Sequence, residues 1–378
     1  MPDAQVIKPN RDFIRKVKAV GGDSVEKCYQ CATCSVVCNL SPEDCPFPRK
    51  EMIWTQWGLG EKLMTDPDVW LCHQCSDCTV DCPRGARPGD VMAAIRRVAF
   101  EYFAFPGFMG RLLASPAGLP VLLLIPLLVI GALSMVHIGG DFNHLLSEPV
   151  EYGLFIPHGW IEALFISGNV LIFLFAAVGL SRFYRGMVQS WNVKPEKGFI
   201  SATITASFDV VFHNRFNKCE TSGYRKAAHM LVFFGFFGAF ATAGLALILM
   251  IVAPDQYPPI PFTNPVKWLG NASGLAMLIG IVIILVQRSR DDEIAGQSTY
   301  GHSLFIWMLL IVAATGMLMQ PLRIYDLREV AYMTYFIHLL VVFFLLWYAP
   351  YSQLGHMFYR TLAMIFARSI GREARELE

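Results

Sequence analysis

Residues 72–83 read CHQCSDCTVDCP, and they repeat a cysteine pattern that first occurs in CYQCATCSVVC at residues 28–38. Both segments follow the spacing C-x2-C-x2-C-x3-C. They hold eight of the ten cysteines of the chain and therefore belong to one module. The residues before the module, MPDAQVIKPNRDF, contain no apolar stretch of the kind found in a signal peptide. We expect the cysteines to stay in the cytoplasm, where metal binding is favoured over disulfides.

The duplicated spacing is typical of a ferredoxin with two 4Fe–4S clusters. Three closely spaced thiolates bind three irons of one cluster, and the fourth ligand comes from the other segment. Zinc sites usually pair two C-x2-C segments with four ligands in all, which fits less well. Cys45 and Cys219 match neither segment and are assigned no role. The predicted ligand sets are Cys28, Cys31, Cys34 and Cys82 for one cluster, and Cys72, Cys75, Cys78 and Cys38 for the other.

The residues around the cysteines form a domain that we place at residues 1–105. In PGDVMAAIRRVAFEYF, Pro88 suits a helix start, and Val91, Ile95, Val98 and Tyr102 recur at helical spacing. The two cysteine segments, their separation and the run WLCHQCSDCTVDCPRGARPGDVMAAIRR resemble the heterodisulfide reductase C subunit over roughly residues 20–100. The resemblance implies a helical ferredoxin that exchanges electrons with a flavin- or iron–sulfur-bearing partner.

The rest of the chain is too apolar for a soluble core. Of 378 residues, 54% are hydrophobic and only 16% are charged, against about a quarter charged in soluble proteins. The net charge of +1 gives no reason to expect nucleic acid. A bilayer crossing takes roughly 20 apolar residues. Six runs meet that length, near residues 117–138, 159–180, 228–253, 266–287, 301–320 and 331–350.

The loops between the runs set the orientation. The loop at 181–227 carries eight Lys and Arg against three acids, whereas 139–157 and 254–265 contain neither Lys nor Arg. By the positive-inside rule the 181–227 loop is cytoplasmic, and six spans leave both termini on that side. We therefore predict an all-α protein of the inner (cytoplasmic) membrane: a cytoplasmic ferredoxin domain, a six-helix transmembrane bundle at 106–360 and an amphipathic interfacial tail at 361–378. GNASG, at 270–274, predicts close helix packing.

HLLVVFFLLWYAPYSQLGH, at 338–356, has a histidine at each end of an apolar run. The interval of 18 residues equals five helical turns, so one continuous helix would present His338 and His356 on the same face, about 27 Å apart. That span is close to the hydrocarbon thickness of about 30 Å and suits a helix that ligates two stacked haems. Pro350 lies between them and could kink the helix.

Other histidines supply possible partners. His229 opens the third span at the level of His356, so we pair these two on an inner haem b. For an outer haem we pair His338 with His158, and His137 is the rival. His302 could replace His229 or line a quinone pocket. His73, inside a cysteine loop, either tunes a cluster or lies on the surface, and His213 is interpreted as solvated surface. Interfacial histidines that merely sit at the headgroups are the alternative to haem ligation.

Spans two to six, with AAHMLVFFGFFGAFATAG at 227–244 and the 18-residue histidine interval, resemble the gamma subunit of respiratory nitrate reductase. The resemblance implies a five-span cytochrome b with two haems that reacts with quinone. That family normally has a second histidine ten residues after the first, at the position of Ala239 here. The resemblance therefore does not supply the second ligand of the outer haem.

A ferredoxin fused to such a cytochrome resembles the C subunits of Qmo, the quinone-interacting membrane-bound oxidoreductase of sulfate-reducing microbes. The resemblance implies menaquinol as donor, two cytoplasmic flavin and iron–sulfur subunits like the A and B subunits of Qmo, and adenylylsulfate reductase as eventual acceptor. The chain would be the quinone-reactive subunit of a multi-subunit oxidoreductase, with no other substrate site. Three alternatives remain: a membrane subunit of a heterodisulfide reductase or sulfite-reduction complex, a quinone reductase fed by soluble ferredoxin, and a non-redox zinc-binding scaffold.

Overall fold

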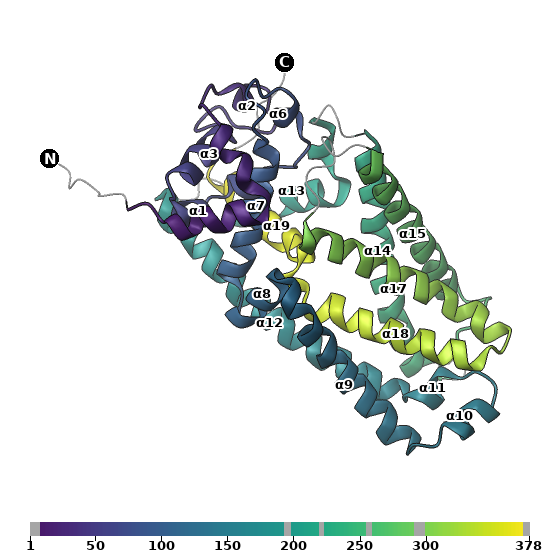
Figure 1. Cartoon of the computed structure of the whole chain (residues 1–378). Helices are drawn as coiled ribbons and strands as arrows, with labels where there is room; N and C mark the ends of the chain where they lie inside the picture. The colour runs from purple at the N-terminus through teal and green to yellow at the C-terminus, as the bar shows by residue number, and fades with distance from the viewer. Residues whose placement is uncertain (1–7, 193–197, 219–222, 255–258, 291–298, 373–378) are drawn as a thin grey trace.

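The computed structural model describes residues 8–192, 198–218, 223–254, 259–290 and 299–372 (Figure 1). Every regular element in these ranges is helical, and none of them is a strand. Within these ranges, six helices are long and apolar enough to cross a membrane. The predicted all-α class and the six spans are therefore confirmed. Cys219 lies outside the described residues.

The N-terminal domain is built from short helices and two cysteine loops. Its longest helix, α7, starts at Pro88 as predicted and buries Val91, Ile95 and Val98. Tyr102 is exposed, and Phe103 takes the buried position in its place. The helices of this domain are α1 (Arg11–Val17), η1 (Lys18–Gly22), η2 (Asp23–Lys27), α2 (Thr33–Val36), α3 (Arg49–Gln56), α4 (Gly60–Met64), α5 (Asp68–Leu71), α6 (Asp77–Val80) and α7 (Pro88–Phe103).

The bundle follows after α8 (Gly107–Ala114) and η3 (Pro116–Gly118). Its second long helix continues to Trp191, well past the predicted end at 180, because Phe183 and Met187 pack into the core of the N-terminal domain. The bundle comprises α9 (Leu119–Ile138), α10 (Phe142–Ser147), α11 (Tyr152–Phe155), α12 (His158–Trp191), α13 (Phe199–Phe212), η4 (Asn214–Lys218), α14 (Gly223–Val252), α15 (Pro265–Arg290), α17 (Tyr300–Ile324) and α18 (Arg328–Trp347).

Small residues let neighbouring helices of the bundle approach closely. A Cβ on Gly270 would lie 3.0 Å from Thr242 of α14, and one on Gly274 would lie 2.6 Å from Met317 of α17. The predicted close packing at GNASG is thus confirmed. Each of the two glycines packs against a different neighbouring helix. Figure 1 shows α14, α15, α17 and α18 running along the long axis of the molecule beneath the N-terminal domain.

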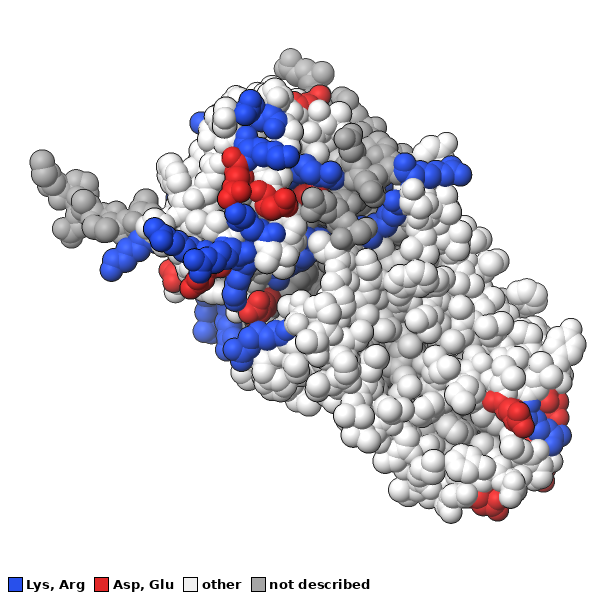
Figure 2. All heavy atoms as spheres, in the orientation of Figure 1, with Lys and Arg blue, Asp and Glu red and all other residues white. Residues whose placement is uncertain are grey.

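Charge is distributed as a membrane requires. In Figure 2, Lys, Arg, Asp and Glu gather on the N-terminal domain and at the opposite tip, and the long face between them is almost free of charge. Large apolar side chains such as Leu128, Leu174 and Ile251 are exposed along this part of the bundle. An apolar band of this kind belongs in lipid.

The segment 338–356 is not one helix. Helix α18 ends at Trp347, two short turns follow (η6, Ala349–Tyr351; η7, Gln353–Gly355), and a new helix, α19, starts at His356 and runs to Ser369. The prediction that His338 and His356 share one helical face is therefore wrong. Pro350 lies in the first of these turns, and a Cβ at position 355 would lie 2.9 Å from the Pro350 carbonyl oxygen, so glycine is required there.

After this turn the chain folds back against the N-terminal domain. Tyr359 stacks on Trp70 with ring centroids 5.0 Å apart, and Ala363 and Phe366 are buried in the same core. Helix α19 therefore packs between the N-terminal domain and the bundle (Figure 1). The predicted boundary at residue 360 falls inside this helix, and the part of the tail that the structure describes is held by protein contacts.

Candidate functional site

The two cysteine loops have the same backbone conformation. Gln30 and Ala32 in the first loop have φ of 64° and 73°, and Gln74 and Ser76, at the matching positions of the second loop, have φ of 52° and 77°. Left-handed backbone is unfavourable for residues with a side chain, and such residues cluster at functional sites. Each loop uses these two positions to wrap around a centre, and each then enters a one-turn helix, α2 or α6.

The thiols fall into two groups that exchange their fourth members. Helices α2 and α6 contact each other, so the cysteine that follows each helix reaches the opposite loop. Electrostatic interactions join Cys82 to the first loop and Cys38 to the second. The first group contains Cys28, Cys31, Cys34 and Cys82, and the second contains Cys72, Cys75, Cys78 and Cys38.

Both groups are suited to metal. Burial, reinforced by the neighbouring thiols, raises the pKa of Cys34 and of Cys38 to about 12. Burial also raises the pKa of Cys78. Each group thus holds thiols that burial keeps protonated unless a cation compensates the charge of their thiolates, and iron supplies that charge in an iron–sulfur cluster. The second group also lines a small cavity of its own, beside Phe47 and Gln74.

Cations from the bundle hold the second loop. Arg225, at the start of α14, donates to the carbonyls of Gln74 (2.9 Å) and Cys75 (3.2 Å). Arg360 of α19 donates to the Cys72 carbonyl at 2.8 Å. The loop is thus fixed to two elements of the bundle, and the two guanidinium groups add positive charge beside it.

Directly below this loop, a cavity lies among α13, α14 and α19. Four histidines reach it: His73 from the cysteine loop, His213 from the end of α13, His229 from α14 and His356 from α19. The sequence-predicted pair His229 and His356 is therefore brought to one site. His213 is buried with 6% of its surface exposed, so its interpretation as solvated surface was wrong. The remaining walls include Arg215, Arg360, Val232, Phe233, Phe236, Phe237, Phe305 and Leu309.

The hydrogen bonds around His213 determine the tautomer of His229. Nδ1 of His213 lies 3.2 Å from the Val211 carbonyl, which can only accept, so this nitrogen carries the proton. Nε2 of His213 is therefore the acceptor, and it lies 2.9 Å from Nδ1 of His229. His229 must donate from Nδ1, which leaves its Nε2 as a free lone pair. A neutral imidazole held in this way has the tautomer that metal binding requires.

His356 has the same tautomer as His229, and His302 has the other tautomer. Nδ1 of His356 donates to the Gln353 carbonyl, so its Nε2 also offers a lone pair. Burial lowers the pKa of His356 to about 4, which keeps the ring neutral. Arg288, which can only donate, lies 2.9 Å from Nδ1 of His302. His302 therefore carries its proton on Nε2 and is a donor, and it lies in a second cavity away from His229.

His338 also presents a ligand tautomer, in the middle of α18. Its Nδ1 lies 3.0 Å from the Thr315 hydroxyl, which donates its own proton to the Ile311 carbonyl at 2.6 Å. His338 must therefore donate from Nδ1, and its Nε2 is free. The ring packs on α17 at Gly316.

The two proposed partners of His338 lie elsewhere. His158 is the first residue of α12 and sits beside Gly153. Ring contacts Phe155–Phe336 and Phe165–Phe343 place His158 and His338 at one level of the bundle, but no described contact joins their rings. His137 is exposed against Trp160, with ring centroids 5.8 Å apart.

His73 connects the two kinds of site. It follows Cys72, lines both the cavity of the second cysteine group and the histidine cavity, and packs edge-on against Phe216 at 4.7 Å. Both ring nitrogens are buried without a hydrogen-bond partner among the described residues. The cysteine loop and the histidine cavity are therefore separated by a single imidazole.

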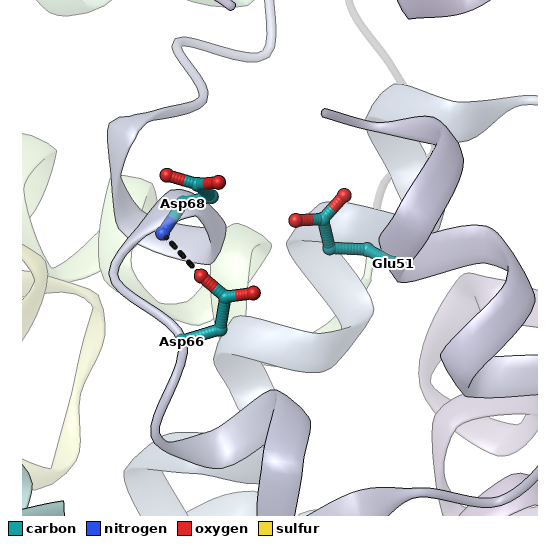
Figure 3. Close-up of side chains that lie close together, drawn as sticks. All are labelled: Glu51, Asp66 and Asp68. Carbon is teal, nitrogen blue, oxygen red and sulfur yellow. Dashed lines mark hydrogen bonds between the residues drawn. The ribbon is translucent and has the colours of Figure 1, made fainter. Parts of the chain in front are cut away.

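The N-terminal domain contains a buried cluster of three carboxylates whose spacing would suit a metal ion. Glu51, Asp66 and Asp68 bring carboxylate oxygens within 4.8 Å of one another (Figure 3). The Nζ of Lys50 takes the place that a metal ion would have, because it pairs with all three carboxylates. Arg372 closes the cluster from the C-terminal segment through Asp68 and the carbonyls of Asp44 and Cys45. The cluster is an ion-pair network that fixes this segment to the N-terminal domain.

The fold and the two cysteine groups define a multi-pass membrane protein of the iron–sulfur electron-transfer class. Residues 24–86 match the 4Fe-4S dicluster domain, and residues 110–377 match the family described as citrate utilization protein B. The second match covers more than half of the chain, and the chain belongs to this family. No solved structure matches it.

Curated relatives match over the iron–sulfur part. The C subunit of the H(2):CoB-CoM heterodisulfide,ferredoxin reductase of Methanothermobacter marburgensis is 37% identical over 102 residues, which is 27% of this chain and 52% of the relative. A protein of Archaeoglobus profundus, described as like the C subunit of heterodisulfide reductase, is 35% identical over 89 residues, 23% of this chain and 47% of the relative. The chain spans about half the length of these relatives. They support an iron–sulfur subunit of a larger redox complex, as predicted.

Proposed function

We propose that this chain is the quinone-reactive membrane subunit of a respiratory complex, and that it carries electrons between menaquinol and soluble flavin and iron–sulfur subunits. The observation that carries the proposal is the position of His73, which lines both the cavity of the second cysteine group and the cavity of His229 and His356. Two redox sites separated by one side chain form a continuous path for electrons. The excess of Lys and Arg at 181–227 supports an orientation in the inner membrane that leaves the N-terminal domain in the cytoplasm.

In this proposal the cysteines hold two 4Fe–4S clusters with exchanged fourth ligands. Cys82 completes the cluster of the first loop, and Cys38 completes that of the second. The grouping of the thiols supports this assignment, as do the identical left-handed positions of the two loops. The contact between α2 and α6 places each fourth cysteine at the opposite loop.

The histidine cavity would hold a haem b with His229 and His356 as axial ligands. Both rings are neutral, and both have an unprotonated Nε2. Arg215 and Arg360 line the same cavity and can pair with propionates. The cavity measures about 120 Å³, less than a macrocycle needs, so we expect Phe233 and Phe237 to change rotamer on binding. Haem and cluster each exchange one electron at a time.

A second haem would use His338. Its tautomer suits ligation, and it lies in the membrane at a level different from His356. We retain His158 as the proposed partner because ring contacts place it at the same level, although His338 faces α17. For this second haem, unlike the first, the described contacts do not bring two histidine ring nitrogens to face each other.

We propose a Qmo-like assembly, with two cytoplasmic flavin and iron–sulfur partners that pass electrons onward to adenylylsulfate reductase. The relatives named as heterodisulfide reductase subunits favour an alternative in which the partner acts on a heterodisulfide. The family description favours another alternative, a partner that serves citrate utilisation. Electron transfer through this chain is common to all three.

Purification of the complex tests these proposals together. We expect about eight iron atoms in clusters per chain, since each 4Fe–4S cluster holds four. We also expect a reducible haem b band and oxidation of a soluble menaquinol analogue linked to reduction of the copurified partners. The identity of those partners separates the three assemblies. Zinc in place of iron, with no visible absorption, would instead support the non-redox scaffold.

A further inference from the structure

A second cavity lies where the N-terminal domain meets the bundle. It has a volume of about 810 Å³ and lies among η1, α7, α8 and the ends of α17 and α18 that face the N-terminal domain. Ligand pockets usually measure about 300–1,000 Å³. The lining combines apolar side chains, among them Phe305 and Phe344 of the bundle, with a polar wall to which the bundle contributes Tyr300 and His302 and the N-terminal domain contributes Arg97. A ligand with a polar head and a long apolar chain matches this combination.

The polar groups that lack partners here are neutral. The hydroxyls of Thr299 and Tyr300 are buried without a hydrogen-bond partner among the described residues. His302 follows on the same helix, and the Arg288 contact keeps its proton on Nε2. A buried polar group without a partner costs about 1–3 kcal/mol, so a ligand that supplies acceptors would be favoured.

The cations of the cavity are mostly engaged already. Lys16 pairs with Glu101 at 3.0 Å, and Arg97 donates to the Val20 carbonyl at 2.6 Å. Lys18 pairs with an acid as well, and Arg111 is exposed at the rim. A lipid phosphate would be favoured by several free cations inside the cavity, whereas of the lining cations only Arg97, whose described hydrogen bond goes to a neutral carbonyl, supplies an unpaired charge there. The carbonyl or hydroxyl oxygens of a neutral head group need the N–H and O–H groups that are present.

We propose that this cavity binds the head group of a quinone, with His302 Nε2–H and the Tyr300 hydroxyl bonded to the quinone oxygens and the isoprenoid chain along Phe305 and Phe344. The inference rests on the proposed function and adds the location of the quinone site. On oxidation a quinol releases two electrons, which pass singly to the haem and clusters, and two protons, which pass to water at the polar wall. The hydroxyl bonds of the quinol become the carbonyls of the quinone.

The test uses the purified complex with menadiol as donor and with the inhibitor 2-heptyl-4-hydroxyquinoline N-oxide as binding probe. His302→Leu and Tyr300→Phe should each raise the KM for menadiol and the Kd of the probe about tenfold, since each removes one hydrogen bond to the ligand. His302→Gln keeps an N–H donor and should recover part of the loss. Tyr325→Phe removes an exposed hydroxyl at the other end of α17 and is the matched control.

The outcomes separate this inference from the proposed function. If the wild-type complex neither oxidises menadiol nor binds the probe, the proposed function fails. If it does both and the His302 and Tyr300 variants match Tyr325→Phe, the cavity is not the quinone site. Loss of copurifying phospholipid in those variants, with unchanged probe binding, would assign the cavity to a lipid and overturn the inference. Haem and cluster spectra must stay unchanged in all four variants.

Discussion

Nε2 of His213 lies 2.9 Å from Nδ1 of His229, and this contact determines which nitrogen of His229 can bind a metal. His213 is itself fixed by the Val211 carbonyl, so its Nε2 can only accept. A ligating histidine usually donates its second nitrogen to such a partner. In the proposed haem site, His213 is thus a positioning residue that acts through His229.

We predict that His213→Leu weakens haem binding about 10- to 100-fold without removing the ligand, the usual effect of losing a partner of this kind. His213→Asn keeps an acceptor and should recover most of the haem. The measurements are haem content per chain and the haem midpoint potential. If His213→Leu has full haem content and an unchanged potential, His213 is a packing residue only.

Replacement of either proposed axial ligand should remove the haem of this cavity. His229→Ala and His356→Ala are expected to lose one reducible haem b while they retain the iron of the clusters, because the cysteine groups use no histidine. His302→Leu, the control, should keep the full haem spectrum, since His302 carries its proton on the nitrogen that would bind iron. An intact haem band in His356→Ala would disprove the pairing.

The exchanged cluster ligands can be tested with three serine variants. Cys82→Ser should reproduce the EPR changes of Cys28→Ser, because both residues belong to the first thiol group. It should differ from Cys72→Ser, which affects the second cluster. If Cys82→Ser instead matches Cys72→Ser, each loop ligates its own cluster with all four cysteines.

Features with a local pattern could be predicted from the sequence. The cysteine loops depend on spacing within eleven residues, and the six spans depend on the apolar content of each run. The presence of the loops and spans, and their order along the chain, could therefore be predicted without knowledge of how the helices pack. The span of α12 was predicted too short because its last residues, up to Trp191, leave the membrane and pack on the N-terminal domain.

The histidines could be assigned only in part, because their roles depend on contacts between distant segments. The site of His229 and His356 was predicted from their depth, although the helix assumed for His356 breaks at Trp347. His213 was missed because it lies in a basic loop. The apolar segment 199–212 directly before it was the available signal, since such a helix packs against protein or membrane.

The arginines around the second cysteine loop should raise the potential of its cluster. Arg225 donates to two carbonyls of this loop, and its charge favours the reduced, more negative cluster. Arg225→Gln should lower the midpoint potential of that cluster by tens of millivolts in an EPR-monitored redox titration. The first cluster should not shift, and Arg185→Gln, an exposed change on α12, should leave both unchanged. Equal shifts of both clusters would contradict a local effect.

The buried acidic network predicts a pH dependence of stability. Burial, the largest influence, raises the pKa of Glu51 from 4.5 to about 8, and it raises the pKa of Asp66 as well. The folded chain therefore binds more protons than the unfolded chain between about pH 4.5 and pH 8, so stability must fall as the pH rises through this window. We expect the full chain in detergent to lose its cluster absorbance at a lower temperature at about pH 9 than at about pH 6.

Glu51→Gln should remove much of that fall and stabilise the chain at about pH 9, because a neutral amide needs no proton to remain buried. Glu61→Gln, an exposed change nearby on α4, should leave the pH profile as it is. Lys50→Met leaves three buried carboxylates without their central cation and should destabilise the fold by about 3–5 kcal/mol. A pH profile of Glu51→Gln that superimposes on that of the wild type would show that Glu51 stays ionised in the folded chain, held by Lys50.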